Sequence, residues 1–213
     1  MSNKLLILSG PTATGKTALA IKLAKKFNGQ LISADSRQIY RGMDICTGKD
    51  HDIGTKISLV DLIYPNQSFS VAEYQKLALA TIKDIQSQSK LPIVVGGTGQ
   101  YIDSLINPHT ETFSVKPNWF LRFFLNRFPL KLLQFTLRLF DFPTFRLLNN
   151  SDLHNPHRLI RKIEISLSKN KPFPALSREG IGEGFDFLHV SLTAPNSSLY
   201  SRIDQRVEKR LKQ

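Results

Sequence analysis

The sequence predicts an α/β fold, in which a parallel sheet carries helices on both faces and the chain leaves the sheet once for a helical insertion. Three observations support this prediction. The first hundred residues alternate short β-rich runs with helical patterns, which is typical of a parallel sheet. From residue 107 the sequence becomes rich in phenylalanine, arginine and proline. Residues 185–192 then alternate like a strand that returns to the sheet.

The elements of the sheet follow one another in the first 107 residues. We expect strands at residues 4–9, 30–34, 56–61 and 91–95, each a short run bounded by polar or turn residues. A helix at residues 16–27 places Leu19, Leu23 and Phe27 on one side. A capping box at residues 70–73 opens a second helix, which carries Tyr74, Leu77, Ala78 and Ile82 inward, and a short helix covers residues 101–106.

Prolines divide the segment that follows. Pro117, Pro129 and Pro143 bound predicted helices at residues 118–128 and 130–140, and a further helix is predicted at residues 157–167. A charged amphipathic helix begins at residue 197, and no glycine, asparagine or proline closes it. We therefore divide the chain into the first part of the core at 1–107, a basic and aromatic helical insertion at 108–184, and a return to the core at 185–213.

Composition excludes several classes of protein. The chain has 213 residues, 41% of them hydrophobic and 22% charged, and no apolar run approaches the ~20 residues of a membrane span. Cys46 is the single cysteine, so an internal disulfide and a thiolate metal cluster are excluded. The apolar stretch at residues 5–8 lacks the cleavage site of a signal peptide. We expect a cytoplasmic monomer without membrane contact.

The net charge of +12 favours a polyanionic partner. The densest basic tract is residues 115–146, where Asp141 is the one acid. Its basic side chains are Lys116, Arg122, Arg127, Lys131, Arg138 and Arg146.

Residues 10–17 match the pattern G-x-x-x-x-G-K-[ST] between a predicted strand and a predicted helix, which is the context that this phosphate-binding motif requires. Its glycines let backbone N–H groups surround phosphate oxygens, Lys16 adds a point charge, and Thr17 can hold Mg²⁺. The motif predicts a P-loop NTPase-like sheet, although an ordinary glycine-rich turn stays an alternative. The loop comprises Gly10, Pro11, Thr12, Ala13, Thr14, Gly15, Lys16 and Thr17.

A P-loop alone does not identify the reaction. An ATPase or a kinase usually has a second strand that ends in an acid holding Mg²⁺. Asp61, at the end of the strand predicted at residues 56–61, is the only acceptable candidate for this acid. A turn or a helix cap is an equally good interpretation of Asp61. The more apolar strand at residues 91–95 ends in Gly-Gly-Thr instead, which favours another loop that contacts phosphate.

Asp35 directly follows the predicted strand at residues 30–34. Ligands of open α/β sheets bind beyond the carboxyl ends of the strands, so this carboxylate should project into the same crevice as the P-loop. As an isolated acid it would more often cap a turn or pair with Arg37 or Arg41.

Three long motifs, in this order, resemble the tRNA dimethylallyltransferase (tRNA isopentenyltransferase) family. They are Gly-Pro-Thr-Ala-Thr-Gly-Lys-Thr at residues 10–17, Ser-Ala-Asp-Ser-Arg-Gln-Ile-Tyr-Arg-Gly-Met-Asp-Ile at 33–45, and Leu-Pro-Ile-Val-Val-Gly-Gly-Thr-Gly-Gln-Tyr at 91–101. The resemblance continues at residues 155–161 and 199–207, so it covers most of the chain apart from the phenylalanine-rich insert.

The resemblance implies transfer of a prenyl group from dimethylallyl diphosphate to N6 of the adenosine 3′ of a tRNA anticodon. It implies that Asp35 accepts the N6 proton, that Lys16, Thr17 and Arg206 bind the diphosphate with Mg²⁺, and that Thr98 lies near the transferred group. Proton acceptance is physically reasonable because an arylamine is a poor nucleophile. The positions that match tRNA-contacting residues of the family are Asp35, Ser36, Arg37, Gln38, His157, Arg158, Leu159, Ile160 and Arg161.

The insert interleaves aromatic residues with arginines. These aromatics are Trp119, Phe120, Phe123, Phe124, Phe128, Phe135, Phe140, Phe142 and Phe145. We expect most of them to form the core of the insert rather than to stack on bases, with a membrane-surface helix as the minority interpretation. The resemblance implies a helical insertion that approaches the tRNA anticodon stem, where basic residues would contact phosphates.

Other functions stay open at this point. They are an adenylate dimethylallyltransferase acting on free AMP or ATP, a P-loop small-molecule kinase, and a non-catalytic RNA-binding remnant. The net charge of +12 favours a large polyanion over a free nucleotide. The resemblance also implies a further helical section after residue 213, so the sequence is either a fragment or a minimal version. We expect these 213 residues alone to bind substrates weakly and to transfer the prenyl group poorly.

Overall fold

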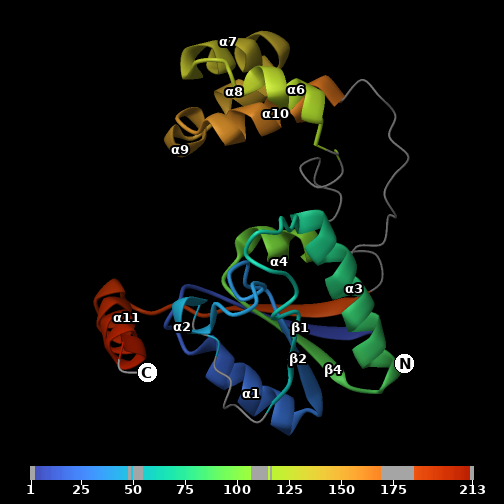
Figure 1. Cartoon of the computed structure of the whole chain (residues 1–213). Coiled ribbons are helices and arrows are strands. Elements are labelled where there is room, and N and C mark those ends of the chain that lie inside the picture. Colours follow the sequence, from blue (N-terminus) through green and yellow to red (C-terminus); the bar gives the residue numbers. More distant parts are fainter. Residues whose placement is uncertain are drawn as a thin grey trace. The chain divides into compact units, whose positions relative to one another are not determined.

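The computed structural model describes residues 3–47, 49, 55–106, 115, 117–168 and 185–211. The chain separates into two compact units (Figure 1). The first unit combines residues Met1–Pro108 with Glu179–Gln213, and the second unit is His109–Arg178. The ends of the predicted insertion, residues 108 and 184, lie outside the described residues. In the described part of the chain, no helix is long and apolar enough to cross a membrane.

The first unit is built on a parallel sheet. Its strands are β1 (Lys4–Ser9), β2 (Gly29–Ser33), β3 (Ile57–Ser58), β4 (Leu91–Val95) and β5 (Asp186–Ser191), in the spatial order β3-β2-β4-β1-β5. Each neighbouring pair is parallel. The predicted α/β class is therefore confirmed, and so is the return of the chain to the sheet beside β1.

Helices cover both faces of this sheet, as the sequence predicts (Figure 1). α1 (Lys16–Lys26) packs its Ala20 and Ala24 against one face, where Leu8 and Ile93 lie. α3 (Val71–Ser87) and α4 (Gly99–Ile106) cover the other face. Successive strand residues alternate between the two cores because side chains of a strand point to opposite faces. Ser70 closes the predicted capping box of α3 by accepting a hydrogen bond from Glu73 N–H.

The strand expected at residues 56–61 is shorter than predicted. β3 ends at Ser58 because Leu59 and Asp61 adopt left-handed backbone conformations, with φ of 62° and 55°. The segment bonds instead to the loop that follows β2, where Asp61 N–H donates to the Gln38 carbonyl at 3.1 Å. Asp61 therefore lies in a turn and not at the end of a strand.

The carboxyl ends of the strands converge at one edge of the sheet. Gly96 N–H donates to the Leu8 carbonyl and Leu192 N–H donates to the Ser9 carbonyl, which ties together the loops after β4, β5 and β1. A Cβ on Gly10 would lie 2.2 Å from the Leu192 oxygen, and one on Gly96 would lie 2.1 Å from the Ala34 oxygen. Only glycine permits these close approaches. The remaining elements of this unit are α2 (Asp44–Thr47) and α11 (Asn196–Leu211).

The second unit is entirely helical in its described residues. It contains α6 (Trp119–Leu125), α7 (Leu130–Phe140), α8 (Phe142–Arg146), α9 (Asn150–Leu153) and α10 (Pro156–Ser168). Asn118, Asp141 and Asn149 cap α6, α8 and α9 by accepting hydrogen bonds from backbone N–H groups. The buried core of the unit consists of Leu125, Leu133, Leu137, Leu159, Ile160 and Ile163.

This core corrects the expectation that the aromatic residues of the insert would fill it. Trp119 and Phe120 are 85% and 75% exposed, and of the nine aromatics only Phe145 packs against the described core. Leucine and isoleucine occupy the interior, and most of the rings lie at the surface. We call the exposed apolar residues of α6, α7 and α8 and of the turns beside them the apolar outer face. They are Trp119, Phe120, Phe123, Phe124, Phe128, Leu132, Phe135, Leu139, Phe140, Phe142 and Leu147.

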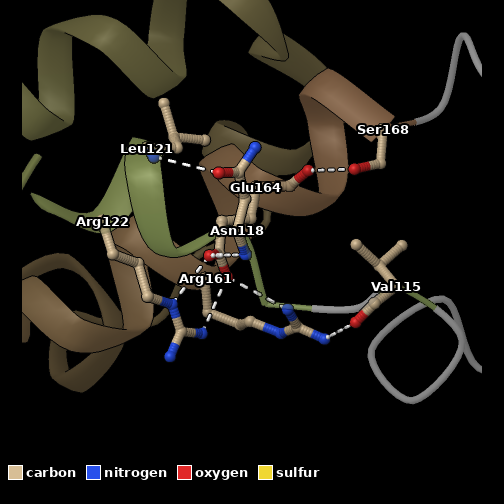
Figure 2. A network of polar contacts seen from close by, with 7 residues as sticks. All are labelled: Val115, Asn118, Leu121, Arg122, Arg161, Glu164 and Ser168. Atoms are coloured by element: carbon tan, nitrogen blue, oxygen red, sulfur yellow. Dashed lines mark hydrogen bonds and ion pairs between the residues drawn. The ribbon is translucent and has the colours of Figure 1, made fainter. Parts of the chain in front are cut away.

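One buried carboxylate joins α10 to α6 (Figure 2). Glu164 is 1% exposed and accepts two hydrogen bonds from Arg122, at 2.7 and 2.8 Å. It also accepts from Asn118 N–H at 2.9 Å and from Arg161 at 3.0 Å. Burial opposes ionisation of Glu164, but these donors outweigh it and hold its pKa below the usual value. Arg122 and the Asn118 amide therefore fix the start of α6 on α10, while Arg161 reaches Glu164 from α10 itself.

Candidate functional site

The P-loop connects β1 to α1 in the conformation expected of a phosphate-binding turn. Ala13 and Gly15 both have positive φ, at 63° and 84°, so the backbone curls before α1 begins at Lys16. Thr14 Oγ1 donates to the Pro11 carbonyl at 2.9 Å and closes the turn. Consecutive N–H groups and the start of an eleven-residue helix make this loop suited to an anion.

Lys16 lies over the loop that precedes it. Its ammonium group donates to the Pro11 carbonyl and approaches Thr14 Oγ1 at 3.4 Å. Burial lowers the pKa of Lys16 below 10.5, Asp35 opposes this change, and the positive charge of Arg206 adds to it. A cation in this partly desolvated position interacts more strongly with phosphate than an exposed lysine would.

Asp35 follows β2 at the same edge of the sheet. Its carboxylate accepts a hydrogen bond from Arg37 N–H at 2.8 Å, which forms a turn at the end of the strand. Thr98, from the loop after β4, accepts from Ser36 N–H at 2.9 Å, and Thr98 N–H donates to the Ala34 carbonyl at 3.1 Å. The two loops are therefore fixed to each other, with half-buried Asp35 beside the junction.

α11 closes the site from the far end of the chain. Arg202 donates to the Ala13 carbonyl of the P-loop at 3.3 Å. Arg206, one helical turn further on, is close enough to lower the pKa of Lys16. Both arginines line the same cleft as the P-loop. Residues separated by almost the whole sequence thus supply cations to one place.

The wall of the cleft also contains a buried cation. Lys49 is 4% exposed in its side chain and pairs with Asp44 at 2.9 Å and with Asp61. It also donates to the Tyr40 carbonyl at 2.5 Å. Burial alone would lower the pKa of Lys49, but the two carboxylates outweigh it and leave the pKa raised. The carboxylate of Asp61 therefore holds Lys49, which favours the structural interpretation of Asp61 over the metal-binding one.

These groups surround one cleft of about 930 Å³. Its lining includes Lys16 and Thr17 of α1, Asp35 and Gln38 after β2, and Arg206 of α11. The structure thus brings together the predicted P-loop residues, Asp35 and Arg206. Thr98 takes part through its bond to Ser36. The polar groups that converge here can hold a polyphosphate beside a proton acceptor.

Comparison with known proteins assigns the family. The model of the family described as IPP transferase matches residues 38–213. This chain is 39% identical over 217 residues to a tRNA dimethylallyltransferase of Carboxydothermus hydrogenoformans, and the match covers 98% of this chain and 69% of the relative. It is 40% identical over 220 residues to one of Anoxybacillus flavithermus, covering all of this chain and 68% of the relative. The chain belongs to the IPP transferase family.

Solved structures of IPP transferases agree with this assignment. The full-length tRNA isopentenylpyrophosphate transferase of Bacillus halodurans matches 99% of this chain and 67% of its own, with a TM-score of 0.64 and 32% identity. A eukaryotic dimethylallyltransferase acting on tRNA matches with a TM-score of 0.77 and 26% identity, over 99% of this chain and 53% of its own. The resemblance stated from the three motifs is confirmed.

The sequence positions expected to contact tRNA fall into both units of this IPP transferase. Asp35, Arg37 and Gln38 line the cleft, and Ser36 bonds to Thr98 beside it. The other five are the consecutive residues His157, Arg158, Leu159, Ile160 and Arg161, all on α10.

The α10 positions differ greatly in exposure. Leu159 and Ile160 are 0% and 3% exposed in the core of the second unit, so their side chains support the helix from within. Arg161 belongs to the Glu164 network, and Arg158 pairs with Asp152 at 2.7 Å. His157 and Arg158 are the exposed members of the set. The expected contact with tRNA stays a prediction for these residues.

Two residues that the motifs did not single out support the site. Arg202 contacts the P-loop directly, and Lys49 joins α2 to the turn that contains Asp61. The signal for Arg202 was its place one turn before Arg206 on a predicted helix. No sequence pattern indicated Lys49. One of its partners, Asp44, lies in a short helix, and the other, Asp61, lies in a turn that the sequence pattern predicted as part of a strand.

Proposed function

We propose that the chain transfers a dimethylallyl group from dimethylallyl diphosphate to N6 of the adenosine immediately 3′ of a tRNA anticodon. One observation carries the proposal: the cleft joins a P-loop, two arginines of α11 and the carboxylate of Asp35. The relatives named tRNA dimethylallyltransferase support the choice of reaction and substrates. Phosphate binding and a carboxylate base would fit a kinase equally well. The names of the relatives therefore favour prenyl transfer over phosphoryl transfer.

The cations of the cleft suit a diphosphate that departs. As the bond between the prenyl carbon and the diphosphate oxygen breaks, negative charge accumulates on the phosphate oxygens. The N–H groups of the P-loop, Lys16 and Arg206 would stabilise this charge. Arg202 would keep the P-loop in shape, because it holds the Ala13 carbonyl on the outer side of the turn.

Asp35 would remove the proton from N6 as the new bond to carbon forms. A carboxylate that accepts the proton during attack contributes on the order of 10²- to 10⁴-fold to the rate. The Arg37 N–H bond orients the carboxylate. A single proton thus moves from the amine to Asp35, and the diphosphate carries the bonding electrons away.

Mg²⁺ fits the groups at the phosphate end. Thr17 Oγ1, in the first turn of α1, lines the cleft beside Lys16. Mg²⁺ commonly takes one or two protein oxygens together with phosphate oxygens of the substrate and water. In the described residues, no group of three or more His, Cys, Asp or Glu could hold a metal ion. Thr17 would therefore hold Mg²⁺ together with the diphosphate, whose charge the ion would partly neutralise.

The tRNA would approach the cleft across Ser36, Arg37 and Gln38, and the exposed residues of α10 would contact its phosphates. The net charge of +12 favours such a substrate over free AMP or ATP. We place the reaction in the cytoplasm, where tRNA is available, and expect a monomer to carry it out.

A crossed assay tests the proposal. Dimethylallyl diphosphate or ATP is supplied as donor, with an anticodon stem-loop RNA or AMP as acceptor, and the products are identified by mass spectrometry. We expect prenylated RNA from the first donor and the first acceptor. Prenylated AMP would establish the free-nucleotide alternative, and phosphoryl transfer from ATP would establish a kinase. The Lys16→Met variant should lose the activity and serves as the control.

A further inference from the structure

We propose that the apolar outer face of the second unit binds a lipid surface that carries anionic headgroups. More than half of the large hydrophobic residues that are exposed in the described chain lie between Trp119 and Leu147. Concentrated apolar exposure of this kind marks an interaction site, because soluble monomers rarely present large apolar patches to water. The inference concerns only the second unit and does not depend on the reaction.

α7 shows most clearly that the outer face needs a partner. Leu133 and Leu137 are fully buried in the core. Leu132, Phe135 and Leu139 are exposed on the same helix. A helix with apolar residues on both its inner and its outer side normally packs against a partner on each side. α6 repeats the pattern, since Leu125 is buried whereas Phe120 and Phe124 are exposed.

The charges around this face are positive. Arg127, Lys131, Arg138 and Arg146 are exposed. Asp141 is the one acid between residues 119 and 147, and its carboxylate already accepts hydrogen bonds from Thr144 and Ser166. Apolar side chains surrounded by lysine and arginine match the boundary between acyl chains and anionic headgroups. A second copy of this chain would instead bring two positive rims together.

The packing of the rings also favours lipid over RNA. Phe120 and Phe123 both contact Phe124 edge to face, at 5.0 and 5.5 Å between ring centroids. The guanidinium of Arg127 covers the Phe123 ring at 3.8 Å. Proteins that stack single-stranded bases offer ring faces to them, and RNA helices are recognised through phosphates and 2′-hydroxyls. A cluster of rings packed edge to face is suited to insertion as one apolar body.

The expectation of no membrane contact rested on the absence of an apolar run long enough to span a bilayer. A peripheral surface needs no such run. It needs exposed apolar side chains together with exposed basic ones, and α6, α7 and α8 carry both.

The experiment uses Trp119, the single tryptophan of the chain and a member of the apolar outer face, as an intrinsic probe. The whole protein is mixed with vesicles of phosphatidylcholine alone or with a third phosphatidylglycerol. We expect binding to the anionic vesicles only, with Trp119 emission shifted to shorter wavelength and quenched by brominated acyl chains. The partition coefficient should fall with added salt, because part of the attraction is electrostatic.

Two double variants separate the contributions, and both leave Trp119 in place. Phe120→Ser with Phe135→Ser should lower the partition coefficient at least about tenfold, since two exposed rings no longer enter the apolar layer. Lys131→Glu with Arg138→Glu should abolish the preference for anionic vesicles. Phe27→Ser is the matched control, because Phe27 is an exposed phenylalanine of the first unit, and it should bind like the unaltered protein.

Three results would overturn the proposal. The first is an absence of vesicle binding at every lipid composition. The second is quenching of Trp119 by the anticodon stem-loop RNA without any response to vesicles, which would assign the face to nucleic acid. The third is concentration-dependent self-association in sedimentation velocity without vesicle binding, which would make the face an interface between copies.

Discussion

Asp35 has two possible roles, as a general base and as a turn residue, because it lines the cleft and its carboxylate accepts a hydrogen bond from Arg37 N–H. The Asp35→Asn variant distinguishes them. Asp35→Asn keeps an oxygen that can accept this hydrogen bond but removes proton acceptance. We expect transfer to fall by about two to four orders of magnitude while donor binding and folding stay unchanged. Single-turnover assays and calorimetry with dimethylallyl diphosphate measure the two effects. A loss below tenfold would make Asp35 a structural turn residue only.

Lys16 should make the affinity for dimethylallyl diphosphate decrease at alkaline pH. Burial lowers its pKa below 10.5, so in the free protein it loses its proton earlier than an ordinary lysine. Bound diphosphate favours the charged form and raises the pKa again. Donor affinity should therefore be constant below the lowered pKa and should weaken as the pH rises through it, at values below 10.5.

Calorimetric titrations with dimethylallyl diphosphate across the alkaline range measure this decline. The control is Lys16→Arg, because a guanidinium stays protonated throughout the range. If the decline were equal in both proteins, another group would be responsible for it.

At the scale of single elements, Glu164 holds α6 on α10. Glu164→Gln removes the charge that neutralises Arg122 and Arg161, and we expect the second unit to lose about 2–3 kcal/mol of unfolding free energy, less than for a fully buried pair because both arginines are partly exposed. The pKa of Glu164 is lowered, so this stabilisation is present above pH 4.5 and is lost as the pH falls through the lowered value.

Hydrogen exchange of the α6 amides at neutral and at acidic pH measures both effects. Asp152→Asn is the matched control, since Asp152 pairs with a single exposed arginine and should cost much less. Equal protection of α6 in Glu164→Gln and in the unaltered protein would show that packing alone positions the helix.

Some elements could be predicted from the sequence and others could not. The motif at residues 10–17 and the capping box at Ser70 could be predicted because each depends on neighbouring residues alone. β3 was predicted too long, since the left-handed conformations of Leu59 and Asp61 depend on contacts with the segment after β2. Contacts between distant segments cannot be predicted from the pattern of neighbouring residues.

The exposure of the aromatic residues in the insert could not be predicted from the sequence, for a different reason. The sequence of α7 has apolar residues on both of its sides, so the helical period could not indicate which side faces the core. The assumption that large rings belong inside then placed them wrongly. The cleft was predictable in its main parts, because parallel strands bring the P-loop and Asp35 to one edge, whereas the contact of Arg202 with Ala13 depends on where α11 docks.

For the whole molecule, the net charge of +12 predicts electrostatic binding of RNA. If about six phosphates are neutralised, affinity for an anticodon stem-loop should fall roughly 10³-fold between 50 and 200 mM salt. Fluorescence anisotropy with a labelled stem-loop measures the slope. Binding of dimethylallyl diphosphate over the same range is the internal comparison, because it involves fewer charges. An affinity for RNA that does not change with salt would argue for a free-nucleotide acceptor.

The position of β1 between β4 and β5 has a consequence for the order of folding. β1 leaves the ribosome long before β5, yet the two strands pair in a register that joins Lys4 to Asp186. Gly10, the first residue of the P-loop, lies directly against the Leu192 carbonyl, just after β5. During synthesis the P-loop therefore lacks one of its walls until β5 and Leu192 have been translated. The P-loop becomes able to bind phosphate only after the insertion has been synthesised, so the insertion has time to fold before the cleft exists.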